Sequence, residues 1–151
     1  MQERIKQTQV FTLQPKLAAN LVDLGNAAAV SLDKLLVHLI KLRASQLNGC
    51  AFCQRMHAEE ARQDGEQQQR LDVLAAWPEV SVFSAAEKAA LQWTESLTLL
   101  STQKVDDQDF KALDQYFSQQ QIVDLTVTIA TINSWNRIAA GFNFAPNLGI
   151  N

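Results

Sequence analysis

The stretch "QIVDLTVTIATINSWNRIAAGF", Gln121 to Phe142, decides the fold class of this chain. Its middle, from Val127 to Ile132, is rich in β-branched residues, which favour strands. Over the whole stretch, however, buried-type residues recur with the period of 3.6 residues that is typical of a helix, namely Ile122, Leu125, Ile129, Ile132 and Asn136. Because the chain contains no second strand-like segment to pair with it, the stretch predicts a buried helix.

The remainder of the sequence also favours helices. Leucines at helical spacing follow Pro15, and Ser84 with Glu87 forms a capping-box pattern ahead of another amphipathic run. Only five glycines and three prolines interrupt the chain. A length of 151 residues is enough for one well-buried core but too short for two ordinary domains. The sequence therefore predicts an all-α fold of six or seven helices, in one domain that spans residues 1–151.

Charge and hydropathy limit the partners that we expect. The formal net charge is −3, and the lysines and arginines are scattered, which argues against binding nucleic acid through its phosphates. The N-terminal segment "MQERIKQTQVFTLQP" is too polar for a signal peptide, and no apolar run reaches membrane-spanning length. We therefore expect a cytoplasmic protein that binds neither nucleic acid nor a membrane.

A second stretch, "SQLNGCAFCQRMH" from Ser45 to His57, contains both cysteines of the chain and one of its two histidines. We expect Asn48 to cap a helix that carries the motif, so that Cys50, Cys53 and His57 lie within about 60° of one face. Since His57 follows Cys53 by one turn, its imidazole can take the thiol proton. The helix N-terminus also favours the thiolate.

Two other interpretations of these residues stay open at this point. The cysteines could be buried as small hydrophobic side chains without any function. They could also bind zinc together with His57, with His38 as the fourth ligand. A thioredoxin fold is excluded because the βαβ pattern is missing. His38 lies beside an apolar stripe, where a histidine is commonly a packed or capping residue.

Three segments together resemble the AhpD-like alkylhydroperoxidases of the carboxymuconolactone decarboxylase superfamily: "LIKLRASQLNGCAFCQRMH" (39–57), "EKAALQWTESLT" (87–98) and "VTIATINSWNR" (127–137). The resemblance implies a helical subunit that forms a homotrimer or homohexamer. It also implies a peroxidase whose dithiol cycles through a disulfide and is recharged by a dithiol or a lipoylated protein. The ring-decarboxylating branch of the superfamily matches less well, because it does not depend on a CxxC pair.

Carried over residue by residue, the resemblance makes Cys53 the cysteine that attacks the peroxide, Cys50 the resolving cysteine and His57 part of a proton relay. The peroxidases of this family carry a glutamate twelve residues before the first motif cysteine, where this chain has His38. Both histidines then occupy relay positions. Glu95 is the candidate for a replacement carboxylate.

The first hypothesis is therefore an alkyl hydroperoxide reductase-type peroxidase that uses Cys53, Cys50, His57 and His38, with no metal and no cofactor. The alternative is a metal-binding or redox-sensing oligomer that uses the same thiols and histidines without turnover.

Overall fold

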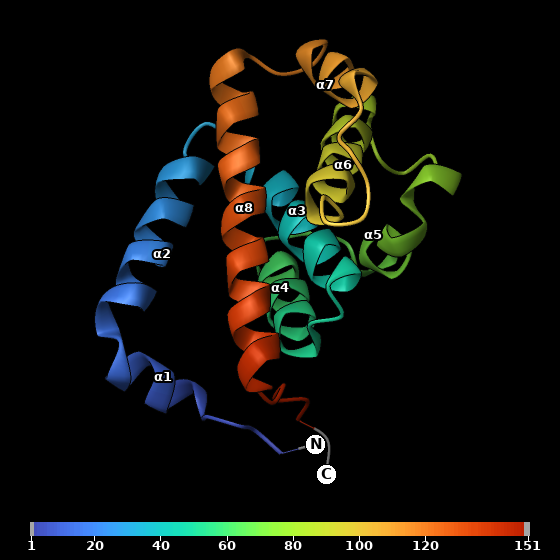
Figure 1. The fold of residues 1–151 in the computed structure, drawn as a ribbon. Helices are drawn as coiled ribbons and strands as arrows, with labels where there is room; N and C mark the ends of the chain where they lie inside the picture. Colours follow the sequence, from blue (N-terminus) through green and yellow to red (C-terminus); the bar gives the residue numbers. More distant parts are fainter. Residues whose placement is uncertain (1, 150–151) are drawn as a thin grey trace.

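The computed structural model describes residues 2–149, and within them every regular element is a helix (Figure 1). The elements in chain order are α1 (Gln7–Leu13), α2 (Pro15–Ala29), α3 (Lys34–Leu47), α4 (Ala51–Gln63), α5 (Gln68–Asp72), the 3-10 helix η1 (Leu74–Glu79), α6 (Ala85–Thr98), α7 (Asp107–Asp114) and α8 (Gln119–Phe142). The predicted all-α class is confirmed.

The predicted number of helices is wrong, because residues 2–149 contain nine helices rather than six or seven. One additional helix is α1, which ends where Gln14 leaves the helical region, with φ −138° and ψ 70°. The residue before a proline is driven out of helical geometry by the proline ring, so Pro15 separates α1 from α2. The other additional helix is η1, which Val73 separates from α5.

The long helix α8 lies at the centre of the fold (Figure 1), and it is the buried helix that its apolar period predicts. Ser118 and Gln121 form a capping box at its N-terminus, and Asn143 ends it in the left-handed conformation. All the residues that defined its buried face are buried, including Asn136 at 1% exposure. Burial thus overrides the strand preference of its β-branched residues. No helix within residues 2–149 is both long and apolar enough to cross a bilayer.

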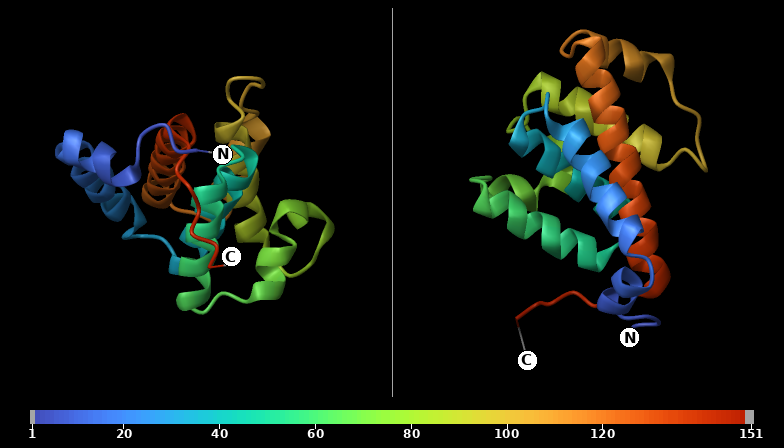
Figure 2. Two further views of the ribbon diagram at one scale, coloured as in Figure 1. Left: turned by 90° about the horizontal axis from the view of Figure 1, so that it is seen from below. Right: turned by 90° about the vertical axis from the view of Figure 1, so that its left-hand side faces the viewer.

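Helix α8 lies between α1 and α2 on one side and the other helices on the opposite side (Figures 1 and 2). α3 packs against α4, α6 and α8, and the main core lies among α3, α6, α7 and α8. α2 packs chiefly against α8 and α1. The motif helix α4 and helix α2 both contact α8, and they lie opposite each other.

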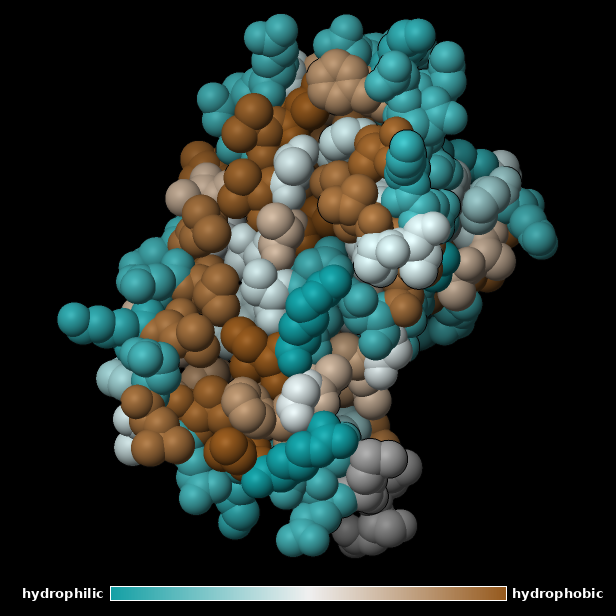
Figure 3. Space-filling model, viewed as in Figure 1, coloured by the Kyte–Doolittle hydropathy of each residue, from teal (hydrophilic) through white to brown (hydrophobic). Residues whose placement is uncertain are grey.

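Apolar side chains remain exposed along α1 and α2. Leu13 and Val30 are 76% and 83% exposed, and Val22 and Leu24 are each 49% exposed. Figure 3 shows apolar residues gathered over this side of the molecule. Such a surface is typical of a contact with another polypeptide.

Candidate functional site

The loop before α4 is fixed to α8 by buried amides. The Asn48 Nδ2 group donates to Oδ1 of Asn133 at 3.0 Å and to Oδ1 of Asn136 at 2.9 Å. Gly49 then turns the chain with a positive φ of 63°. Asn48 ends α3 instead of capping α4, so its predicted role as a helix N-cap is wrong. Its side chain is held by α8 and is not available to the first turn of α4.

The residue that caps α4 is Cys50 itself. Its Sγ accepts a hydrogen bond from the backbone N–H of Cys53 at 3.2 Å. The two cysteines form a disulfide with a Cα–Cα distance of 5.3 Å, and both are buried. The structure thus describes the oxidised form of the pair, at a helix N-terminus that favours negative charge on sulfur.

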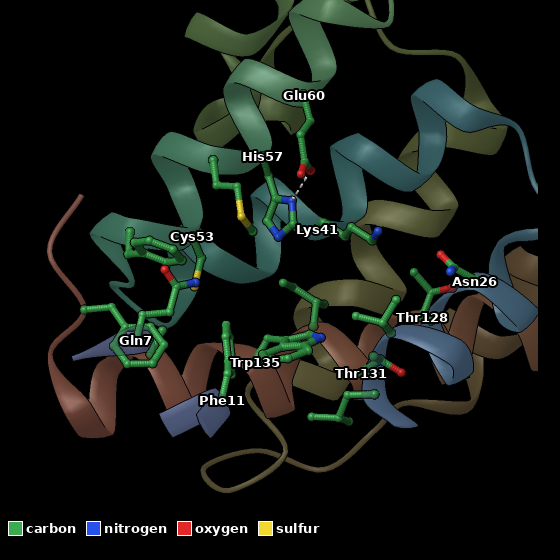
Figure 4. Close-up of a pocket in the computed structure, with 18 residues that line it drawn as sticks. Gln7, Phe11, Asn26, Lys41, Cys53, His57, Glu60, Thr128, Thr131 and Trp135 are labelled. Atoms are coloured by element: carbon green, nitrogen blue, oxygen red, sulfur yellow. Dashed lines mark hydrogen bonds and ion pairs between the residues drawn. The ribbon is translucent and has the colours of Figure 1, made fainter. Parts of the chain in front are cut away.

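The two cysteines differ in their access to a cavity. Cys53 lines a cavity of about 310 Å³ that α1, α2, α3, α4 and α8 enclose (Figure 4). Cys50 does not line the cavity, although both cysteines pack in one cluster with Val10, Ala139 and Phe144. The cavity wall is mostly apolar and includes Phe11, Leu21, Phe52, Met56, Ile132 and Trp135. Of the two sulfurs, that of Cys53 is the one presented to a small molecule in the cavity.

His57 lines the same cavity and is oriented by Glu60. His57 is 5% exposed, and its Nδ1 lies 2.9 Å from Glu60 Oε2. Because a carboxylate only accepts hydrogen bonds, the ring proton is on Nδ1 and the lone pair is on Nε2. Nε2 is buried without a partner and points into the cavity (Figure 4). His57 therefore presents a free base next to Cys53 on the same helix.

The protonation states of this pair follow from its surroundings. Burial lowers the pKa of His57 below its usual value, although the hydrogen bond and charge of Glu60 oppose this effect. The hydrogen bond from His57 in turn lowers the pKa of Glu60. At neutral pH the pair is a neutral imidazole beside a carboxylate, which is the form that accepts a proton.

His38 occupies a different position. Its Nε2 lies 2.6 Å from Oδ2 of Asp64, and the Lys34 ammonium lies 2.6 Å from Oδ1 of the same carboxylate. These two contacts, with Lys34 the stronger, lower the pKa of Asp64. Asp64 ends α4 at the opposite terminus from Cys50, and His38 does not line the cavity. The structure thus does not bring His38 to the thiols, and its part in a proton relay stays a prediction.

Glu95 also lies away from the thiols. Its Oε1 accepts hydrogen bonds from Arg43 Nε and from Trp77 Nε1, each at 2.7 Å. The carboxylate beside the site histidine is Glu60, which was not among the predicted site residues. The spacing of His57 and Glu60, three residues apart on one helix, was the signal that could have identified it.

The residues that would bind zinc in the alternative interpretation are not brought together into one group. Within the described part of the chain, no group of three or more His, Cys, Asp or Glu side chains is arranged to hold a metal ion. The cysteines are bonded to each other, and His38 binds Asp64.

Known proteins share this sequence and this fold. The chain is 44% identical over 109 residues to the uncharacterized protein YdfG of Bacillus subtilis (strain 168). This match covers 72% of this chain and 74% of YdfG. The crystal structure of ATU0492 from Agrobacterium tumefaciens, a protein of unknown function assigned provisionally to the antioxidant defence proteins AhpD, superposes with a TM-score of 0.90. That match has 37% identity and covers 97% of this chain and 99% of ATU0492.

The debrominase Bmp8, solved with 2,3,4-tribromopyrrole, shares the fold at 18% identity and a TM-score of 0.81, over 91% of this chain and 74% of Bmp8. The AhpD-like resemblance of the three motif segments is confirmed. Residues 15–96 match the model of the carboxymuconolactone decarboxylase family, and the chain belongs to that family.

Proposed function

We propose that this protein is a thiol peroxidase that reduces organic hydroperoxides with Cys53 and passes the oxidation on to Cys50. One observation carries the proposal. The sulfur of Cys53 and the free Nε2 of His57 line the same apolar cavity, while Cys50 is within bonding reach behind it. The family membership supports thiol chemistry at this motif but leaves the substrate open.

The reaction starts from the reduced pair. Neutral His57 takes the proton of the Cys53 thiol at Nε2, and the thiolate attacks one peroxide oxygen. The O–O bond breaks, Cys53 becomes a sulfenic acid, and the alkoxide leaves with the proton from His57 as an alcohol. The Cys50 thiol then attacks the sulfenic sulfur, which forms the disulfide and releases water. Both electrons that reduce the hydroperoxide come from the dithiol.

Regeneration needs an external dithiol, either a small molecule or a lipoylated protein. Its thiolate would attack Cys53, the sulfur on the cavity wall, and Cys50 would leave. The hydrogen bond from the Cys53 N–H to Cys50 Sγ stabilises this leaving thiolate. A second exchange within the mixed disulfide releases the oxidised reductant. The exposed apolar residues of α1 and α2 support assembly into a trimer or hexamer.

Mass spectrometry of the thiols tests the proposal. Reduced wild-type protein, Cys50→Ser and Cys53→Ser are each mixed with one equivalent of an alkyl hydroperoxide and quenched with an alkylating reagent. We expect the wild type to close its disulfide within seconds, and Cys50→Ser to trap a sulfenic acid on Cys53. Cys53→Ser should consume no peroxide.

Two results would contradict the proposal. Full peroxide consumption by Cys53→Ser would show that another residue attacks. Wild-type thiols that react no faster than free cysteine would favour the redox-sensing or metal-binding alternative. Metal analysis of protein purified without chelator then separates those two.

A further inference from the structure

The cavity that holds Cys53 has a polar end. Figure 4 shows Lys41, Thr128 and Asn26 on the side of the cavity away from Cys53, with His57 between them. The three residues come from α3, α8 and α2. Between this end and Cys53 the wall is largely apolar. The cavity therefore offers hydrogen-bond donors at one end and a reactive sulfur at the other.

The hydroxyl of Thr128 is unused by the protein. Thr128 is 1% exposed, and its Oγ1 is buried without a hydrogen-bond partner. Neighbouring hydroxyls of α8 behave differently, since those of Thr126 and Thr131 each donate to the backbone carbonyl four residues earlier at 2.8 Å. A buried polar group without a partner is costly, and a bound ligand is one way to satisfy it.

The ammonium group of Lys41 is also without a carboxylate partner. Within residues 2–149, the one lysine that forms an ion pair is Lys34, with Asp64. Lys41 is half-buried on the cavity wall. After the stronger effect of burial, its charge contributes to the lowered pKa of His57, so the ammonium acts on the site electrostatically. Glu60, the acid on the same wall, is bonded to His57 and not to Lys41.

We propose that Lys41 and Thr128 bind the carboxylate of the substrate, so that the preferred hydroperoxides are those that carry a carboxylate at one end of an apolar chain. An ammonium and a hydroxyl are the donors that a carboxylate requires, and such charge-assisted bonds are strong in an apolar site. Asn26 lies exposed at the same end and adds an amide donor. That the substrate is a hydroperoxide rests on the proposed peroxidase activity. That the cavity binds a carboxylate does not depend on that activity.

Binding without chemistry is the first test. Octanoate and octanol are titrated into reduced wild-type protein and into Lys41→Met, Thr128→Val and Lys111→Met, with calorimetry as the readout. We expect wild-type protein to prefer octanoate, and Lys41→Met to bind it about tenfold or more weakly, as expected when a charged hydrogen bond is lost. Thr128→Val keeps the shape of the side chain and should weaken octanoate binding less.

Lys111 is the matched control, because it is an exposed lysine on α7 that does not line the cavity. Its replacement removes the same charge from the protein and should not change octanoate binding. The proposal is overturned if octanoate and octanol bind equally to the wild type. It is also overturned if Lys41→Met binds octanoate as tightly as Lys111→Met does.

Turnover is the second test, with a fatty-acid hydroperoxide and its methyl ester as paired substrates below their micellar concentrations. We expect kcat/KM to favour the acid in wild-type protein, and the acid-to-ester ratio to fall by about tenfold in Lys41→Met. An equal ratio in both proteins contradicts the inference and leaves the peroxidase intact. Octanoate binding that depends on Lys41, without turnover of either hydroperoxide, contradicts the peroxidase and leaves the carboxylate site intact.

Discussion

Nδ1 of His57 lies 2.9 Å from Oε2 of Glu60, and both residues belong to α4. The histidine of the dithiol site thus takes its carboxylate partner from its own helix, three residues later. The orientation of the base is set locally, and it does not depend on how α3 packs against α4. This pair gives the site a histidine–carboxylate arrangement although the position of the family's upstream glutamate is His38.

Replacing Glu60 tests this arrangement. Glu60→Gln removes the negative charge that opposes the burial effect, so the pKa of His57 should fall further. A less basic imidazole takes the thiol proton less readily, and we expect kcat/KM to fall by about tenfold at pH 7. This is less than the about 10²- to 10⁴-fold that a general base contributes, because His57 itself is still present. The acid limb of the pH–rate profile should move to lower pH. Glu59→Gln is the control, because Glu59 binds Arg55 instead. Identical profiles for the two variants would contradict the assignment.

Stability should depend on the protonation of His57. Because its folded-state pKa lies below the ordinary value of 6.5, the unfolded chain binds a proton that the folded chain resists. The free energy of unfolding should therefore be insensitive to this group above about pH 6.5 and fall as the pH drops below it. The pKa of Glu60 is also lowered, so protonation of this carboxylate reduces the free energy of unfolding further at more acidic pH.

Urea unfolding from about pH 8 to about pH 5 measures this dependence. The slope from one such group is at most about 1.4 kcal/mol per pH unit. His57→Gln removes the titrating ring, and we expect its stability to decline less steeply over the upper part of this range. If the free energy of unfolding of the wild-type protein rose on acidification, His57 would not be a buried, neutral imidazole in the folded state.

Gly49 should resist substitution for conformational reasons alone. Its φ is 63°, and a Cβ placed there would have no atom within 4 Å, so space is not the obstacle. Gly49→Ala is expected to cost about 1 kcal/mol because an L-residue is strained in this region. Gly141→Ala is the matched control in a helix with equal space, where alanine should stabilise by up to about 1 kcal/mol. Chemical denaturation of both variants provides the measurement.

The buried amide of Asn136 is expected to stabilise the motif loop. It accepts from Asn48 and donates to Ser45 Oγ at 3.0 Å, with 1% of its surface exposed. Asn136→Leu leaves Ser45 and part of the Asn48 amide without their partner, and should cost about 2–3 kcal/mol. Ser134→Ala, which loses only a bond to its own helix, should change stability by less than about 0.5 kcal/mol. Similar unfolding midpoints for both variants would argue against the loop anchor.

Sequence patterns predicted what depends on local periodicity. The period of α8 identified a buried helix despite its β-branched centre, and the spacing of Cys50 and Cys53 identified a pair that can form a disulfide. The patterns failed where a side chain had two possible partners. Asn48 has the chemistry of a helix cap, but two asparagines on α8, more than eighty residues later, compete for its amide. The spacing of His57 and Glu60 allowed their pairing, but it does not show that the ring turns toward this carboxylate.

Helix α8 has one more consequence, if the cavity binds a chain-like acid as proposed. Thr128 at the polar end and Ala139 beside the cysteines both lie on it, eleven residues apart, which corresponds to about 16 Å along the axis. The helix then acts as a ruler, because it fixes how far from its carboxylate a substrate must carry the peroxide to meet the sulfur. Moving the carboxylate-binding residue by one helical turn would change this distance by about 5.4 Å. Positional isomers of one hydroperoxide would then react at rates set by the distance between carboxylate and peroxide, rather than by the intrinsic reactivity of the peroxide.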